Sequence, residues 1–187
     1  MRIINNQNIL LLDEVNKAIT TSSKVYLSCN HFTALALFEL IPSLSNAHSI
    51  EFLLSMDFNQ QDDFRLIHSN SENKLELSLD RKYKLNQVIE LIEKKIQIRH
   101  GGIGNQNVLI IEDKGKSTCF TLTPLDFDSL CLGVISSKTP IFITCFEDAG
   151  NQFLGLFQNT WSNSKSLINV AVTERLKKGT VNLTPEA

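Results

Sequence analysis

Residues 101–132 constrain the fold of this chain more than any other stretch. The runs at 107–112 and 117–122 are rich in β-branched and aliphatic residues, and Asp-Lys-Gly at 113–115 lies between them. Asp-x-Gly between two such runs is a strong signal for a tight β-hairpin. A Thr-Pro pair at 123–124 then interrupts the pattern and leads into a short helix. The segment therefore predicts a hairpin inside an α/β domain.

The apolar periodicity of the chain switches repeatedly between helical and β spacing. Helical spacing covers 8–20, 34–44, 85–96 and 150–161, with a last helix ending near residue 178, and either Asn6 or Asn8 is placed to cap the first helix. β-rich runs cover 24–30, 49–55, 96–99, 107–112, 117–122, 130–135 and 140–146. The near-continuous apolar run at 49–55 is typical of a buried parallel strand. This order predicts an α/β fold with a mixed, mostly parallel central sheet and helices on both faces.

Two changes in composition divide the chain. Residues 57–84 are rich in Asn, Gln, Asp and Ser, and they predict a long connection with at most a helical turn. The pattern changes again after Asn163. We therefore expect an α/β domain at 1–165, followed at 166–187 by a C-terminal helix and a tail that is a candidate linker to a further domain.

The composition indicates a globular chain in a reducing, cytoplasmic setting. Hydrophobic residues make up 42% and charged residues 20% of the 187, which separates the chain from disordered proteins. A net charge of −2 offers no overall basic field for nucleic acid, although a local patch stays open. The cysteines lack C-x-x-C spacing and lie in apolar stretches, which favours buried free thiols: Cys29, Cys119, Cys131 and Cys145. The N-terminal apolar run is too short for a signal peptide or a membrane span.

The residues predict no metal or cofactor site. The histidines, His31, His48, His68 and His100, form no pair with the spacing of metal ligands. The glycines at 101–104 precede a strand, whereas a dinucleotide-binding loop follows a strand and opens a helix. Their exposed amides could still bind an anion. The chain has no G-x-S-x-G motif, and no cysteine has a basic neighbour that would activate it.

Two stretches together resemble the phospholipase D-like superfamily, most closely its modules at the N-termini of bacterial helicases and restriction-type proteins. Residues 24–40 have the family's strand, turn and helix, with Asn30, His31 and Phe32 at the turn. The hairpin region corresponds to the family's H-x-K strand and its following G-S-x-N-x-T run. The resemblance spans about residues 8–165 in layout.

The diagnostic residues of that family are missing here. Asn105-Gln106-Asn107 stands at the H-x-K position, and Glu112 falls near the family's acidic position. On the G-S-x-N-x-T run only Thr123 matches. In the family one histidine attacks phosphorus, a second protonates the leaving oxygen, and lysines hold the negative charge. An Asn amide is a very weak nucleophile without a titratable proton near neutral pH, so Asn105 cannot replace the histidine and Asn107 lacks the charge of the lysine.

The resemblance therefore implies a vestigial pocket with no catalytic residue, no metal and no cofactor. Its expected members are His31, Asn105, Asn107, Glu112 and Thr121. The expected function is that of a catalytically inactive module acting in binding or assembly, in a bacterial DNA-processing or phage-defence system. Its expected partner is another protein or an adjoining helicase-type domain. Nucleic acid and a homodimer are further options, and a membrane is not expected.

The alternative function is an active phosphodiesterase or nuclease. It would use a non-standard histidine, His31 or His100, across a dimer.

Overall fold

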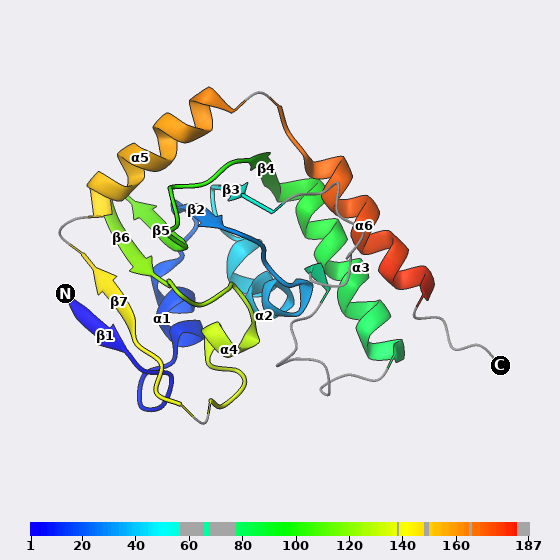
Figure 1. The fold of residues 1–187 in the computed structure, drawn as a ribbon, viewed down its shortest axis with the longest axis horizontal. Helices are drawn as coiled ribbons and strands as arrows, with labels where there is room; N and C mark the ends of the chain where they lie inside the picture. The colour runs from blue at the N-terminus through cyan, green and yellow to red at the C-terminus, as the bar shows by residue number, and fades with distance from the viewer. Residues whose placement is uncertain (57–65, 68–77, 138, 148–149, 165, 183–187) are drawn as a thin grey trace.

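The computed structural model describes residues 1–56, 66–67, 78–137, 139–147, 150–164 and 166–182, which form an α/β fold on a seven-stranded mixed sheet (Figure 1). The strands are β1 (Arg2–Ile4), β2 (Lys24–Cys29), β3 (Ser49–Leu54), β4 (Ile96–His100), β5 (Val108–Asp113), β6 (Lys116–Thr121) and β7 (Ile143–Phe146). The helices are α1 (Leu11–Ala18), α2 (Ala34–Leu44), α3 (Ser78–Lys95), α4 (Ser129–Leu132), α5 (Gly150–Asn163) and α6 (Asn169–Asn182). The prediction of an α/β fold is confirmed.

The strand order across the sheet is β1-β7-β6-β5-β2-β3-β4. The pairs β2–β3 and β3–β4 are parallel, and the four other pairs are antiparallel. The prediction of a mostly parallel sheet is therefore wrong. Helices α2 and α3 make the crossovers that parallel strands need, but β5, β6 and β7 follow one another without such a crossover. Strand β5 then enters antiparallel to β2 and joins the two parts of the sheet.

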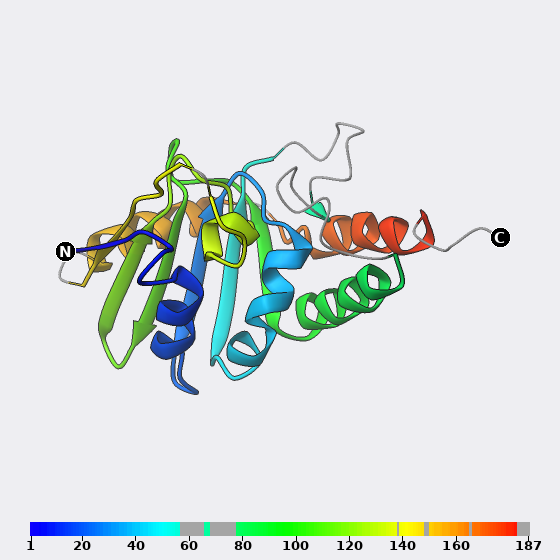
Figure 2. The same ribbon diagram turned by 90° about the horizontal axis from the view of Figure 1, so that it is seen from below.

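Helices cover both faces of the sheet (Figure 2). On one face, Leu154 and Phe157 of α5 pack against a small core that includes Tyr26. On the opposite face, α1, α2 and α4 contribute to the larger core, with Leu11 and Leu37 among its fully buried residues. Helices α3 and α6 lie against each other beside β4. Strands β2 and β3 therefore lie between two apolar layers, which the near-continuous apolar sequence of β3 predicts.

The hairpin predicted from the Asp-Lys-Gly sequence is present. Strands β5 and β6 pair from Val108 opposite Thr121 to Asp113 opposite Lys116. The two turn residues between them, Lys114 and Gly115, have φ of 53° and 81°. Positive φ at both central residues is the type I′ geometry, which matches the twist of the flanking strands.

The predicted strand at 130–135 is wrong, because helix α4 begins this segment. Asp128 caps the helix, since its side chain accepts a hydrogen bond from the Cys131 amide at 2.9 Å. Gly133 ends it with a φ of 86°. An acidic N-cap and a left-handed glycine four residues after the first helical residue thus outweigh the β propensity of the residues that follow.

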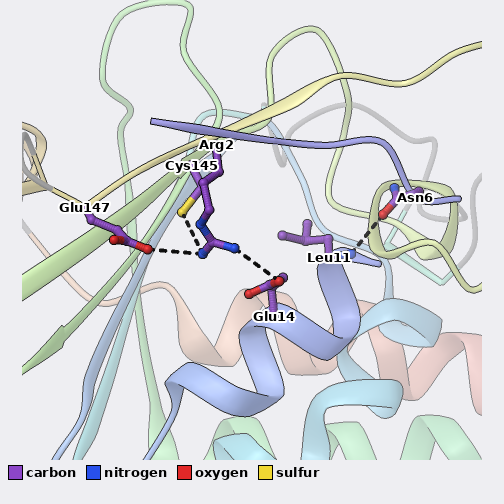
Figure 3. Close-up of polar contacts among 6 residues, drawn as sticks. All are labelled: Arg2, Asn6, Leu11, Glu14, Cys145 and Glu147. Atoms are coloured by element: carbon purple, nitrogen blue, oxygen red, sulfur yellow. Dashed lines mark hydrogen bonds and ion pairs between the residues drawn. The ribbon is translucent and has the colours of Figure 1, made fainter. Parts of the chain in front are cut away.

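Strand β1 was not predicted, and two polar side chains hold the N-terminal segment in place (Figure 3). Arg2 forms ion pairs with Glu14 of α1 at 3.3 Å and with Glu147 after β7 at 3.2 Å. Asn6 has a φ of 57°, and its Oδ1 accepts from the Leu11 amide at 2.8 Å. Of the two capping candidates, Asn6 is therefore the one that binds the start of α1.

Several element boundaries differ from the predicted ranges. Helix α1 covers less than the predicted 8–20, and α3 begins at Ser78, before the predicted 85. Most of the polar connection predicted at 57–84, and the tail at 183–187, lie outside the described residues. No helix in the described ranges combines the length and the apolar character that crossing a membrane requires.

Candidate functional site

A polar cavity of about 350 Å³ opens where the parallel part of the sheet meets the antiparallel part. Its wall combines the end of β2, the residue after β3, the loop before β5 and the segment after β6. The lining residues are Ser28, Cys29, Asn30, Ser55, Gly102, Gly104, Asn105, Gln106, Asn107, Thr123 and Pro124. The carboxyl ends of neighbouring parallel strands, at a change of strand order, are the usual place for a ligand in α/β sheets.

Hydrogen bonds fix the floor of the cavity. Ser28 is fully buried, and its Oγ accepts from the Ile103 amide at 3.2 Å, which ties the loop before β5 to β2. Ser55 Oγ donates to Asn30 Oδ1 at 3.2 Å and so joins the ends of β2 and β3. The loop before β5 lies beside the residue after β3, since an added Cβ at Gly102 would be in ordinary van der Waals contact with the Ser55 Cβ, at 3.5 Å. These contacts organise the polar groups before any ligand binds.

Asn107 contributes to the wall mainly as a structural residue. Its backbone amide donates to Thr123 Oγ1 and its side-chain amide donates to the Leu125 carbonyl, both at 2.8 Å. Its own carbonyl accepts from the Leu122 amide, also at 2.8 Å. Asn107 therefore holds the segment after β6 against the start of β5.

Asn105, unlike Asn107, lies at the tip of a tight turn. The Gln106 amide donates to the Ile103 carbonyl at 3.0 Å, so Gly104 and Asn105 form the centre of the turn. Gly104 has a φ of 55°, which a glycine adopts without strain. Asn105 is exposed, and it lines the cavity from this tip.

The structure brings together only part of the predicted pocket. Asn105 and Asn107 line the cavity, whereas His31, Glu112 and Thr121 are not among its lining residues. His31 is 7% exposed, with Nδ1 3.3 Å from Asn30 Nδ2. Glu112 lies near the far end of β5, opposite Lys24 and Ser117 in the two neighbouring strands. Thr121 uses its hydroxyl to donate to the Thr144 carbonyl at 3.3 Å.

The wall also includes residues that were not predicted as pocket members, notably Ser28, Asn30, Ser55, Gln106 and Thr123. One signal could have indicated two of them. Ser28 and Ser55 end the apolar runs of two strands that are parallel neighbours, and polar residues at such positions meet at one edge of a sheet.

The lining contains no Asp, Glu, Lys, Arg or His among the described residues. Its one thiol, Cys29, is 2% exposed. Burial first, and then the negative charge of Asp126, raise the pKa of the Cys29 thiol well above its ordinary value. The thiol is therefore protonated at neutral pH and is a poor nucleophile. The chemistry that the cavity offers is hydrogen bonding by hydroxyls and amides.

The other candidate sites in the described structure offer fewer free polar groups to a ligand. Within the described part of the chain, no group of three or more His, Cys, Asp or Glu residues is arranged to hold a metal ion. A shallow groove of about 280 Å³ lies between α2 and α3, and Glu90 and Lys94 in its lining form an ion pair with each other.

No protein-family model matches this chain, and its sequence matches no curated protein.

Proposed function

We propose that this chain is a non-catalytic module of phospholipase D-like layout that acts in binding or assembly. We place it in the bacterial cytoplasm, in a DNA-processing or phage-defence system, with another protein or an adjoining helicase-type domain as its partner. The setting and the partner follow from the resemblance of residues 24–40 and of the hairpin region to that superfamily.

One observation carries the non-catalytic part of the proposal. The cavity lies at the start of β5, where the resemblance places the reaction centre, and its described wall contains no charged or imidazole side chain. Phosphoryl transfer through a covalent intermediate needs a nucleophile, a proton donor and positive charge. Asn105 supplies none of these, and the amide of Asn107 is already bound to the Leu125 carbonyl.

The two histidines of the alternative function have other surroundings. His31 Nε2 lies 3.9 Å from Asp126 Oδ2, and His31 is not among the residues that line the cavity. His100 is exposed at the end of β4, and its carbonyl accepts from Ser164 Oγ at 3.0 Å. Neither histidine lines the cavity, so the geometry favours the non-catalytic function.

A hydrolysis assay tests this proposal. The wild-type chain, His31→Ala and His100→Ala are incubated with bis(p-nitrophenyl) phosphate and with a single-stranded oligonucleotide, with and without a chelator. We expect all three proteins to give the rate of the buffer alone. Thermal unfolding of each variant confirms that it is folded. Turnover by the wild type would contradict the proposal, and its loss in either variant would establish the phosphodiesterase alternative.

A further inference from the structure

The cavity between β2, β3 and β5 provides no positive charge for an anion. Its hydrogen-bonding side chains are hydroxyls and carboxamides, all neutral at any physiological pH. A phosphate bound there would exchange part of its hydration for neutral hydrogen bonds without gaining an ion pair, which is costly for a charged group. The lining therefore favours an uncharged ligand.

The helix that follows β2 does not supply an anion site either. In α/β folds phosphate groups commonly bind the free amides at a helix N-terminus. Here the Ala36 amide donates to Thr33 Oγ1 at 3.3 Å, and the Leu35 amide donates to the Ile67 carbonyl at 3.4 Å. The Leu37 amide donates to the Thr33 carbonyl at 3.2 Å. These amides of the first turn of α2 are thus used within the protein.

The charge that acts on one wall of the cavity is negative. Asp126 raises the pKa of Cys29, whose residue forms part of that wall. His31 Nε2 lies 3.9 Å from Asp126 Oδ2. The field of this carboxylate opposes the entry of an anion.

Three carboxamides give the cavity its recognition chemistry. Asn30, Asn105 and Gln106 each carry a donor and an acceptor side by side, and each lines the cavity. Asn30 is oriented by Ser55, and Gln106 Oε1 accepts from Thr123 Oγ1 at 3.3 Å. A carboxamide pairs in a bidentate way with a ligand edge that also has a donor beside an acceptor, as nucleobases do.

The size of the cavity is consistent with such a ligand. A volume of about 350 Å³ lies near the lower end of ligand-binding clefts, which suits a nucleoside better than a large cofactor. The ring of Pro124 adds an apolar surface beside the amides.

We propose that this cavity binds the nucleobase of a nucleoside and discriminates against inorganic phosphate. The proposal rests on the non-catalytic function proposed above and gives that function a ligand class. Asn105 at the turn tip is the side chain whose change should affect binding most directly, because it is exposed and none of the hydrogen bonds described above depends on its side chain.

The test is a titration of the full chain followed by amide chemical shifts in NMR spectra. The probes are the four common ribonucleosides and inorganic phosphate. We expect at least one nucleoside to give saturable shifts at the amides of 102–107 and at the side chains of Asn30, Asn105 and Gln106. Phosphate at the same concentrations should give no saturable shift there.

Substitutions at Asn105 sharpen the test. Asn105→Ala should weaken nucleoside binding about three- to tenfold, the range expected for one neutral hydrogen bond. Asn105→Lys should weaken it as well and should create saturable phosphate binding, because it places a cation on the wall. Asn159→Lys changes an exposed asparagine of α5 and serves as the matched control, which should leave both ligands unaffected.

Phosphate binding to the wild type as tight as nucleoside binding would overturn the inference. The inference would also be overturned if no nucleoside bound to the wild type. It would be overturned as well if either Asn105 variant bound the nucleoside as tightly as the wild type does. The hydrolysis assay separates this outcome from failure of the proposed function. Missing nucleoside binding without hydrolysis removes only the ligand class, whereas hydrolysis by the wild type removes the non-catalytic function.

Discussion

The parallel part of the sheet (β2, β3 and β4) and the antiparallel part (β5, β6, β7 and β1) end in different ways. At the parallel edge, the Ile168 amide donates to the Ile98 carbonyl at 2.7 Å, so the chain before α6 covers β4. At the antiparallel edge, β1 has three residues and pairs only with β7 in the described structure. Ile3 in this strand is 54% exposed. One edge is therefore covered by the chain itself, whereas no other described strand pairs with the outer side of β1.

Both parts use an asparagine to attach a helix. In the antiparallel part, Asn6 Nδ2 donates to the Cys131 carbonyl at 2.8 Å while its Oδ1 holds the start of α1. In the parallel part, Asn169 Oδ1 accepts from the Ile98 amide at 2.8 Å, and its Nδ2 donates to the Ile96 carbonyl at 2.6 Å. A side-chain amide replaces missing backbone partners in each case.

Two helix glycines differ in the kind of atom that an added Cβ would meet. An added Cβ at Gly150, the first residue of α5, would lie 2.0 Å from the Ser117 carbonyl oxygen of β6. At Gly179 of α6 it would lie 2.2 Å from the Ile67 Cδ1, the end of a flexible side chain. A backbone atom in a strand cannot move aside, whereas a side chain can change rotamer. Helix packing on the antiparallel part is thus limited by the main chain.

Alanine substitutions of these glycines should give the largest effects, and the difference between them separates a main-chain limit at β6 from a side-chain limit at Ile67. We expect Gly150→Ala to lower the free energy of unfolding by about 3 kcal/mol or more, because relief needs a shift of α5 away from β6. Gly179→Ala should lower it by roughly 1 kcal/mol, since Ile67 can adjust and alanine favours the helix. Chemical denaturation measures both values.

Gly155→Ala in the middle of α5 is the matched control. An added Cβ there meets nothing within 4 Å, so helix propensity alone should raise the free energy of unfolding by about 0.5–1 kcal/mol. Equal losses for Gly150→Ala and Gly179→Ala would contradict the distinction between main-chain and side-chain limits.

The asparagine clamps should give the next largest effects. Asn169→Ala should lower the free energy of unfolding by about 1–3 kcal/mol, because buried backbone groups lose their partners. Asn6→Ala should lower the free energy of unfolding by about 1 kcal/mol more than Asn169→Ala does, since alanine is also strained at a φ of 57°. Asn6→Gly keeps that φ accessible and should recover this extra loss. If Asn6→Gly were no better than Asn6→Ala, backbone strain would not be part of the Asn6 contribution.

The same contrast explains which elements the sequence could predict. Strands β2 and β3, helix α2 and the β5–β6 hairpin carry their own apolar pattern or turn signal, and all were predicted. Strand β1 was missed because three residues have no pattern of their own, and because its partner strand is far away in the sequence. Arg2, for example, pairs with Cys145, 143 positions further along the chain. The sequence also did not predict that most strand pairs are antiparallel, since this depends on β5 lying antiparallel beside β2.

The cavity could be predicted only in part for a similar reason. Asn105 and Asn107 lie in one short loop, so their proximity follows from the sequence. Ser28 and Ser55 line one cavity only because β2 and β3 are parallel neighbours. Glu112 was expected nearby, but four residues of extended strand lie between it and Asn107 and place it toward the other end of β5.

The smallest expected effect concerns Tyr26, which lies in β2 between a carboxylate from each part of the sheet. Its ring packs edge-on against Phe157 of α5, with ring centroids 5.2 Å apart. Burial first, then the charges of Glu112 in β5 and Glu51 in β3, raise the pKa of Tyr26 from 10.0 to about 12. Because the folded chain holds this proton more tightly than the unfolded chain, the stability that it contributes is complete below pH 10 and is lost as the pH rises toward 12.

Phenolate absorbance can follow Tyr26 alone in the Tyr83→Phe background, since the chain has two tyrosines. We expect a midpoint near pH 12, and we expect Glu112→Gln to lower it more than Glu51→Gln, because Glu112 has the larger influence on the pKa of Tyr26. Tyr26→Phe should remove the corresponding loss of stability between pH 10 and 12. A larger shift from Glu51→Gln would instead make the parallel part the main source of the field at Tyr26, so the order of the two shifts decides which part of the sheet governs this residue.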